Sequence, residues 1–130
     1  MTPEEIALVR ASFRKLVPAA DTVGRTFYQR LFAAHPEMRM FFRSDMEDQS
    51  RALMAMVELV VKTLDLHDKL VPVIHFLGER HAAFGVKPQH YAPFGETLIE
   101  TLAQTLGDEF TPEVRRAWEA AYEFMADNMR

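Results

Sequence analysis

Apolar residues recur every three or four positions through most of this chain, and that period constrains the fold more than any other feature of the sequence. Residues with this spacing share one face of an α-helix, so each series marks a buried stripe. No run of two-residue alternation, the period of a β-strand, competes with it. The stripes are Ile6, Val9, Phe13 and Leu16; Val23, Phe27 and Leu31; Leu53, Met56 and Val60; Leu70, Ile74 and Leu77; Leu98, Leu102 and Leu106; and Val114, Trp118, Ala121 and Met125.

Helix-start signals separate these stripes. Proline is tolerated in the first turn of a helix, where its missing N–H would have no partner anyway. Thr2 and Glu5 have the spacing of a capping box, and Thr111 precedes a further start at Pro112. The other expected starts are Asp21, Pro36, Pro72 and Pro88, and the expected helix ends are Gly85 and Gly107. The pattern predicts an all-α fold with six substantial helices and a short seventh helix near residues 36–42.

Length and composition exclude several classes of protein. A chain of 130 residues is expected to form one domain, 1–130. Its longest stretch without Asp, Glu, Lys or Arg is the nine residues Leu70–Gly78, whereas a membrane-spanning helix needs roughly 18. The N-terminus has no signal-peptide pattern, and the absence of cysteine excludes disulfides and cysteine-ligated cofactors. The net charge of −4 argues against nucleic acid as a partner. We therefore expect a cytoplasmic protein that binds neither nucleic acid nor a membrane.

Three polar residues interrupt the apolar stripes. His81 continues one stripe beyond its last apolar residue, Gln49 stands one turn before another, and Tyr28 lies beside the inward face of a third. An unpaired polar group in an apolar interior costs roughly 1–3 kcal/mol, so each side chain needs a partner. Two interpretations remain open at this point. Each residue finds a backbone carbonyl or a water, or the histidine nitrogen and the two donors face one shared ligand.

Five parts of the chain carry a more specific pattern. They are residues 27–37 (FYQRLFAAHPE), residues 48–53 (DQSRAL), residues 77–81 (LGERH) running on to Gly85 and Val86, Tyr91, and residues 117–122 (AWEAAY). In this order and spacing they resemble the bacterial single-domain globins and the globin domain of flavohaemoglobins. The similarity is greatest to short bacterial globins that have a tyrosine and a glutamine in the distal pocket. The resemblance covers essentially the whole chain.

The resemblance implies the globin fold, with six to seven helices packed around a non-covalent b-type haem. His81 would be the axial ligand of the iron, and Tyr28 and Gln49 would donate hydrogen bonds to a ligand on the opposite side. Tyr91 would polarise His81. The other residues expected at the cofactor are Phe42 against the haem face, Leu53 over the bound ligand, Leu77, Val86 and Phe94 along the pocket, and Arg80 at a haem propionate, with His75 and His90 as alternatives to Arg80.

A pocket of this kind implies binding of dioxygen and of other diatomic ligands, CO and NO. The donors Tyr28 and Gln49 favour dioxygen, because it carries a partial negative charge when bound. The leading hypothesis is a binding protein for storage, delivery or scavenging of dioxygen. The alternative is an enzyme, a nitric oxide dioxygenase that forms nitrate. That enzyme would need a separate reductase, since the chain contains no Gly-rich dinucleotide fingerprint.

Overall fold

The computed structural model describes residues 1–130 as helices joined by short turns, without a strand. The α-helices are α1 (Pro3–Leu16), α2 (Ala20–Ala34), α3 (Met46–Thr63), α4 (His67–Ala83), α5 (Tyr91–Leu106) and α6 (Pro112–Met129). Short 3-10 segments span Val17–Ala19, Pro36–Phe41, Pro88–His90 and Gly107–Glu109. The predicted all-α class is confirmed, and the short seventh helix is the 3-10 segment Pro36–Phe41. None of the helices has the length and apolar content needed to cross a lipid bilayer.

The first and last helices begin where the sequence predicts. The hydroxyl of Thr2 accepts a bond from the Glu5 amide at 3.1 Å, and the Glu5 carboxylate accepts one from the Thr2 amide at 2.8 Å. This is the complete capping box. The hydroxyl of Thr111 caps α6 in the same way, by accepting from the amide of Val114 at 3.3 Å. Both caps satisfy amides that would otherwise lack a partner.

Two other predicted starts are wrong. α4 begins at His67, so Pro72 lies inside the helix instead of opening it. The helix extends back beyond the proline because Leu70 packs on the same buried face as Ile74, while Pro72 itself is exposed. α2 follows directly from the 3-10 segment Val17–Ala19, so Asp21 lies within its first turn and does not cap it. A carboxylate there still favours the positive end of the helix dipole.

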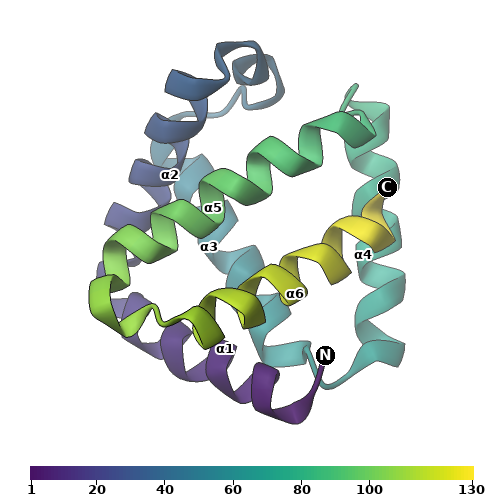
Figure 1. The fold of residues 1–130 in the computed structure, drawn as a ribbon. Coiled ribbons are helices and arrows are strands. Elements are labelled where there is room, and N and C mark those ends of the chain that lie inside the picture. The colour runs from purple at the N-terminus through teal and green to yellow at the C-terminus, as the bar shows by residue number, and fades with distance from the viewer.

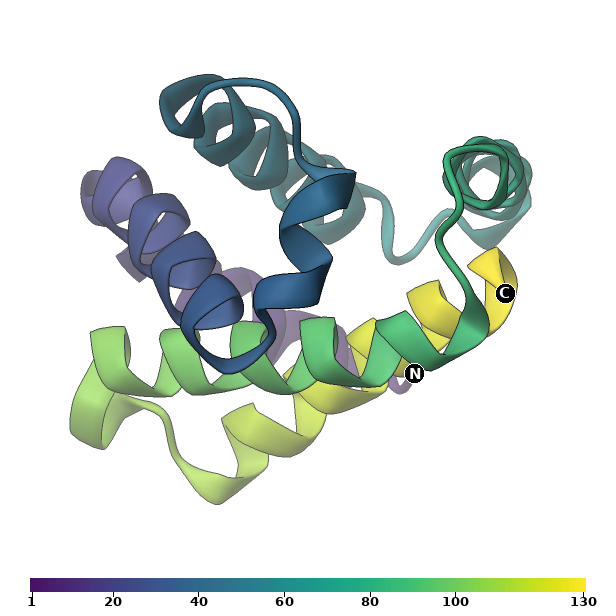
Figure 2. The same ribbon diagram turned by 90° about the horizontal axis from the view of Figure 1, so that it is seen from above.

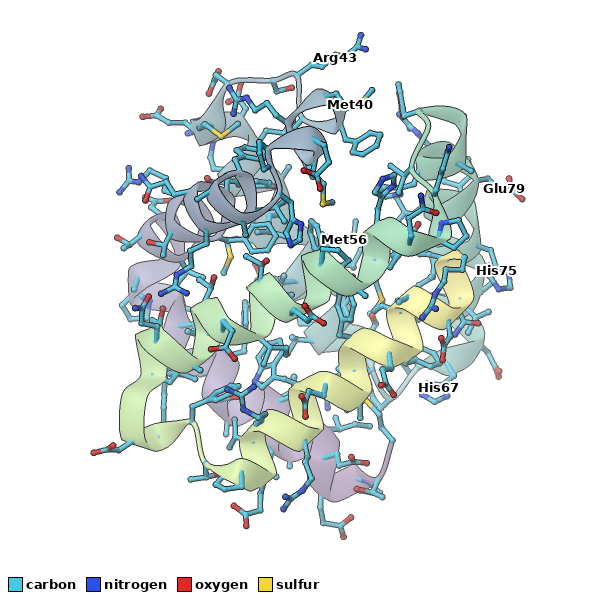
Figure 3. The ribbon with its side chains drawn as sticks, turned by 45° about the horizontal axis from the view of Figure 1, so that its top comes forward. Met40, Arg43, Met56, His67, His75 and Glu79 are labelled. Atoms are coloured by element: carbon cyan, nitrogen blue, oxygen red, sulfur yellow. The ribbon has the colours of Figure 1, made fainter.

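The helices pack as two groups that meet around the interior. α2 packs against α3 and α5, whereas α6 packs against α1 and α4. α5 and α6 run across the front of Figure 1, and α4 runs along its right side. Seen from above, α4 lies on the opposite side of the molecule from α2 (Figure 2). Met56 of α3 lies in the interior, whereas His75 and Glu79 project outward from α4 (Figure 3).

A close crossing of α2 and α3 sets the position of two of the candidate residues. A Cβ atom on Gly24 would lie 2.7 Å from the Cβ of Ser50, which is closer than real Cβ atoms approach. Only glycine therefore allows α2 and α3 to cross at this separation. Tyr28 lies one turn after Gly24, and Gln49 directly precedes Ser50. The crossing thus holds the phenol and the amide on neighbouring helices.

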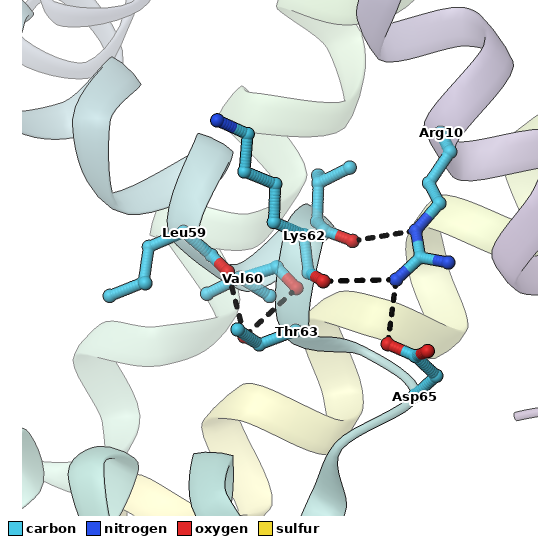
Figure 4. A network of polar contacts seen from close by, with 7 residues as sticks. Arg10, Leu59, Val60, Lys62, Thr63 and Asp65 are labelled. Carbon is cyan, nitrogen blue, oxygen red and sulfur yellow. Dashed lines mark hydrogen bonds and ion pairs between the residues drawn. The ribbon is translucent and has the colours of Figure 1, made fainter.

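Arg10 of α1 closes the C-terminal end of α3. Its Nε donates to the carbonyl of Val61 at 3.0 Å and its Nη2 donates to the carbonyl of Lys62 at 3.0 Å (Figure 4). The same Nη2 pairs with the carboxylate of Asp65 at 2.7 Å. The last carbonyls of a helix have no partner within the helix. Arg10 therefore supplies donors that α3 lacks at the point where the chain turns toward α4.

Replacement of Arg10 with methionine should lower the free energy of unfolding by about 1–2 kcal/mol, because two helix-end carbonyls lose their donor while the apolar stem is retained. Asp65→Asn should have a smaller effect, since the ion pair is exposed to solvent. Urea unfolding followed by circular dichroism measures both variants. Equal losses for Arg10→Met and Asp65→Asn would contradict this assignment and place the stabilisation in the ion pair.

Candidate functional site

An apolar cavity of about 390 Å³ lies between the two groups of helices and is lined by residues of all six α-helices. Its volume is within the range of small-molecule and cofactor sites. Of its 28 lining residues 25 are hydrophobic, and the other three are Gln49, His81 and His90. Tyr28 also lines the cavity. The structure therefore brings the three polar residues that interrupt the apolar stripes to one place.

Of the residues in the main prediction for the pocket, all except Arg80 line this cavity, whereas of the two alternatives to Arg80 His90 lines it and His75 does not. The residues of the main prediction that line it are Tyr28, Phe42, Gln49, Leu53, Leu77, His81, Val86, Tyr91 and Phe94. The guanidinium of Arg80 instead lies over the ring of Phe76, 5.9 Å from its centroid. Both side chains of that pair are exposed on α4. The structure thus gives Arg80 a place on the helix surface, outside the cavity wall.

His81 stands in the last turn of α4 with its ring held by the backbone. Its Nδ1 lies 2.6 Å from the carbonyl oxygen of Leu77. A carbonyl can only accept, so Nδ1 carries the proton and Nε2 keeps a free lone pair. Histidines that bind metal ions are oriented by this kind of bond. Because the partner at Nδ1 is Leu77, the expected polarisation of His81 by Tyr91 stays a prediction.

Tyr28 and Gln49 supply hydrogen-bond donors from α2 and α3. The side chain of Tyr28 is almost completely buried, and its ring packs edge-on against Phe27 and Phe42 at centroid distances of 4.9 and 5.1 Å. Gln49 is half-buried in the first turn of α3. Burial raises the pKa of Tyr28 well above its ordinary value of 10.0, so the phenol keeps its proton at any physiological pH. Two donors are thus available to a ligand in the cavity.

Many other residues that line the cavity were not expected at a pocket. They include Met38, Phe41, Met56, Phe84, Leu98, Ile99, Trp118, Tyr122, Met125 and Met129. Several of them lie on the predicted apolar stripes, which mark the core but do not distinguish a packed side chain from one that faces a cavity. Tyr122 stands one turn after Trp118, so its helical spacing could have placed it on an apolar stripe. Phe84 lies beyond the end of a stripe, and no spacing in the sequence marks it.

All three tyrosines should make the protein sensitive to alkali. Burial raises the pKa of Tyr28, Tyr91 and Tyr122 above the value of 10.0 that applies to an unfolded chain. Between the unfolded and folded pKa values, the folded state holds protons that the unfolded state has lost, so the free energy of unfolding falls as pH rises. The stabilisation is complete below about pH 10 and is lost above it, by up to about 1.4 kcal/mol per pH unit for each of the buried Tyr28 and Tyr122 and by less for the more exposed Tyr91.

Urea unfolding between pH 8 and pH 11.5 tests this expectation. The free energy of unfolding of the wild-type protein should be nearly constant up to about pH 10 and should then fall steeply. Tyr28→Phe should show a shallower decline, because one buried group no longer resists ionisation. Identical slopes for wild type and Tyr28→Phe would exclude a buried, protonated Tyr28.

The chemistry of the cavity fits haem. A porphyrin supplies four nitrogens to its iron and needs an axial nitrogen from the protein, which Nε2 of His81 can provide. The apolar wall suits the flat hydrophobic ring. Fold and cavity together define a helical haem-binding protein. A family model described as Globin matches residues 25–129, and the chain belongs to the globin family.

Relatives and solved structures agree with this assignment. The flavohemoprotein of Deinococcus radiodurans is 36% identical over 99% of this chain, which covers 33% of that protein. The chain spans about a third of the length of the flavohemoproteins it matches. An engineered carbene transferase, derived from a candidate nitric oxide dioxygenase of Rhodothermus marinus, superimposes on this chain with a TM-score of 0.86 at 28% identity. The superposition covers 98% of this chain and 89% of the Rhodothermus marinus chain. A globin from Campylobacter jejuni shares the fold, with a TM-score of 0.83 at 23% identity over 97% of this chain and 91% of its own. The function common to this family is haem-based binding of diatomic gases.

Proposed function

We propose that the protein binds dioxygen reversibly at a b-type haem, with His81 as the axial ligand and with Tyr28 and Gln49 as hydrogen-bond donors to the gas. The observation that carries this proposal is the arrangement of the cavity. One imidazole with a free Nε2 lone pair and two side chains with N–H or O–H donors line the same apolar space.

The residues of the cavity have different roles in holding the haem. Bound haem would supply the iron that takes a diatomic gas. Nε2 of His81 would hold the iron, and the carbonyl of Leu77 keeps the imidazole in the required tautomer. Leu53, Phe42, Val86 and Phe94 would exclude water from the ring.

Tyr28 and Gln49 select among gases. Hydrogen bonds donated by these two side chains would favour dioxygen, because it would carry more negative charge at the site than carbon monoxide. Tyr28 keeps its proton because burial raises its pKa, and it therefore acts as a donor. We expect slow release of dioxygen and discrimination against carbon monoxide.

A second candidate is nitric oxide dioxygenase, in which dioxygen and nitric oxide give nitrate with one electron from a separate reductase. The relatives are named flavohemoproteins, a name that joins a flavin to a haem, and a flavin can supply the electron that this reaction needs. The structural neighbour from Rhodothermus marinus points in the same direction. The same two donors suit both functions.

Absorption spectra of the purified protein test the proposal in its ferric form, after reduction with dithionite and under oxygen. A Soret band and an oxygenated form that persists for minutes are expected. A protein that stays colourless and takes up no haemin would overturn the proposal. Nitrate formation from nitric oxide, with and without an added flavin reductase, separates the two candidates. Rapid nitrate production that depends on the reductase would favour the enzyme.

A further inference from the structure

Of the three lining residues that are not hydrophobic, Gln49, His81 and His90, only His90 has no role in the proposed function. It ends the 3-10 segment Pro88–His90, directly before α5, and its side chain is half-buried. The ring packs edge-on against Phe41, with 4.8 Å between centroids. Phe41 also lines the cavity, so the contact holds the imidazole at the cavity wall.

The backbone orients His90 in the opposite sense from His81. The amide of Lys87 donates to Nδ1 of His90 at 2.9 Å. A backbone N–H can only donate, so Nδ1 carries the lone pair and the proton lies on Nε2. In His81 the proton lies on Nδ1 and Nε2 is free. His81 can therefore bind a metal through Nε2, whereas His90 presents a hydrogen-bond donor at the same atom.

Such a donor suits the acidic side groups of a haem in this cavity. Haem carries two propionate carboxylates, and a carboxylate that leaves water without a donor loses much of its solvation energy. No Asp, Glu, Lys or Arg is among the lining residues. Arg80 lies over Phe76, and His75 projects away from the molecule (Figure 3). Of the three side chains expected at a propionate, only His90 lines the cavity.

We infer that Nε2 of His90 donates a hydrogen bond to a propionate carboxylate of the bound haem. The inference rests on the proposed haem site and adds a residue that retains and orients the cofactor. The two histidines of the cavity thus differ in function, because their backbone hydrogen bonds place the ring proton on different nitrogens. His81 accepts the metal, and His90 binds an acidic side group of the ring.

The test measures haem loss from the reconstituted full chain to an excess of apomyoglobin. Two variants separate the roles of the two ring nitrogens of His90. His90→Asn places an amide oxygen near the position of Nδ1, so it can accept from Lys87 but presents no donor at the position of Nε2. His90→Gln places its amide group near the position of Nε2 and retains a donor there. Each protein is loaded either with haemin or with haemin dimethyl ester, whose esterified propionates carry no charge. His75→Asn serves as the matched control.

With haemin, His90→Asn should lose the cofactor about tenfold faster than wild type, as expected for one charge-assisted hydrogen bond. His90→Gln should stay within about threefold of wild type, and His75→Asn should match wild type. With the dimethyl ester, wild type and His90→Asn should differ by less than about twofold, because the charged partner is gone.

Two results would overturn the inference. If His90→Asn loses haemin and the dimethyl ester faster by the same factor, His90 has a packing role. If the rate of haemin loss is unchanged, His90 forms no bond to a propionate. Uptake of haemin by wild type tests the proposed function separately. The ratio of the two loss rates for each cofactor tests His90 alone.

Discussion

The His81→Ala variant should release haem at least about 100-fold faster than wild type, and its reduced spectrum should lose the features of histidine ligation. Second-sphere partners of metal ligands cost 10- to 100-fold when removed, so loss of the ligand itself should have the larger effect. No other imidazole can take its place. The hydrogen bond from Lys87 occupies Nδ1 of His90 and leaves a proton on its Nε2. Rapid transfer to apomyoglobin and the spectrum under carbon monoxide measure the two effects.

Chemical rescue and a matched variant make this prediction specific. Alanine leaves a space of the size of an imidazole beside the iron position, so added free imidazole should restore most of the wild-type spectrum. His75→Ala removes a histidine from the same helix, where it is exposed and points outward. That variant should retain haem normally. A wild-type spectrum and wild-type haem retention in His81→Ala would show that the iron is held elsewhere.

The helices were predictable because their signals are local. The stripe of Val9, Phe13 and Leu16 and the cap at Thr2 act within a few residues, and both appear in the structure as expected. The prediction at Pro72 was wrong because the residue lies at an exposed position within α4, where it costs the helix one hydrogen bond. Burial of Leu70 decides the start of α4, and that burial depends on the packing of α4 against the other helices, which is not local.

The site was predictable only in part. Tyr28, Gln49 and His81 are visible because each interrupts or extends an apolar stripe, and the resemblance to globins gives them roles. Their presence on one cavity depends on the crossing of α2 and α3 at Gly24 and on the position of α4, which are tertiary features. The tautomers of the two cavity histidines depend on single backbone hydrogen bonds. No spacing in the sequence shows which histidine meets a carbonyl and which meets an amide.

Replacement of Tyr28 with phenylalanine should speed dioxygen release by about ten- to a hundredfold while changing carbon monoxide binding little. One hydrogen bond to a charged acceptor contributes about 1.5–3 kcal/mol, and each 1.4 kcal/mol is a factor of about ten. Phenylalanine keeps the edge-on contacts with Phe27 and Phe42, so the pocket retains its shape. Stopped-flow displacement of dioxygen by carbon monoxide measures the release rate.

The two distal donors should contribute unequally. Gln49 is half-buried and competes with water, so Gln49→Leu should speed release by only about threefold, at the lower end of a net hydrogen bond. If Tyr28 and Gln49 donate to the same gas molecule, the double variant should depart from the product of the single effects. If the effect of the double variant equals that product, the two side chains act independently and do not donate to the same gas molecule.

Tyr122→Phe is the matched control for the loss of a buried phenol. Its hydroxyl donates to the backbone carbonyl of Tyr91 at 2.5 Å, and burial raises its pKa as it does for Tyr28. Removing that hydroxyl takes one hydrogen bond from the carbonyl, so stability should fall by about 1 kcal/mol while dioxygen release stays within twofold of wild type. Tyr28→Phe should show the reverse, because its hydroxyl has no partner in the protein to lose. Unchanged dioxygen release in Tyr28→Phe would remove Tyr28 from ligand binding and leave Gln49 as the donor.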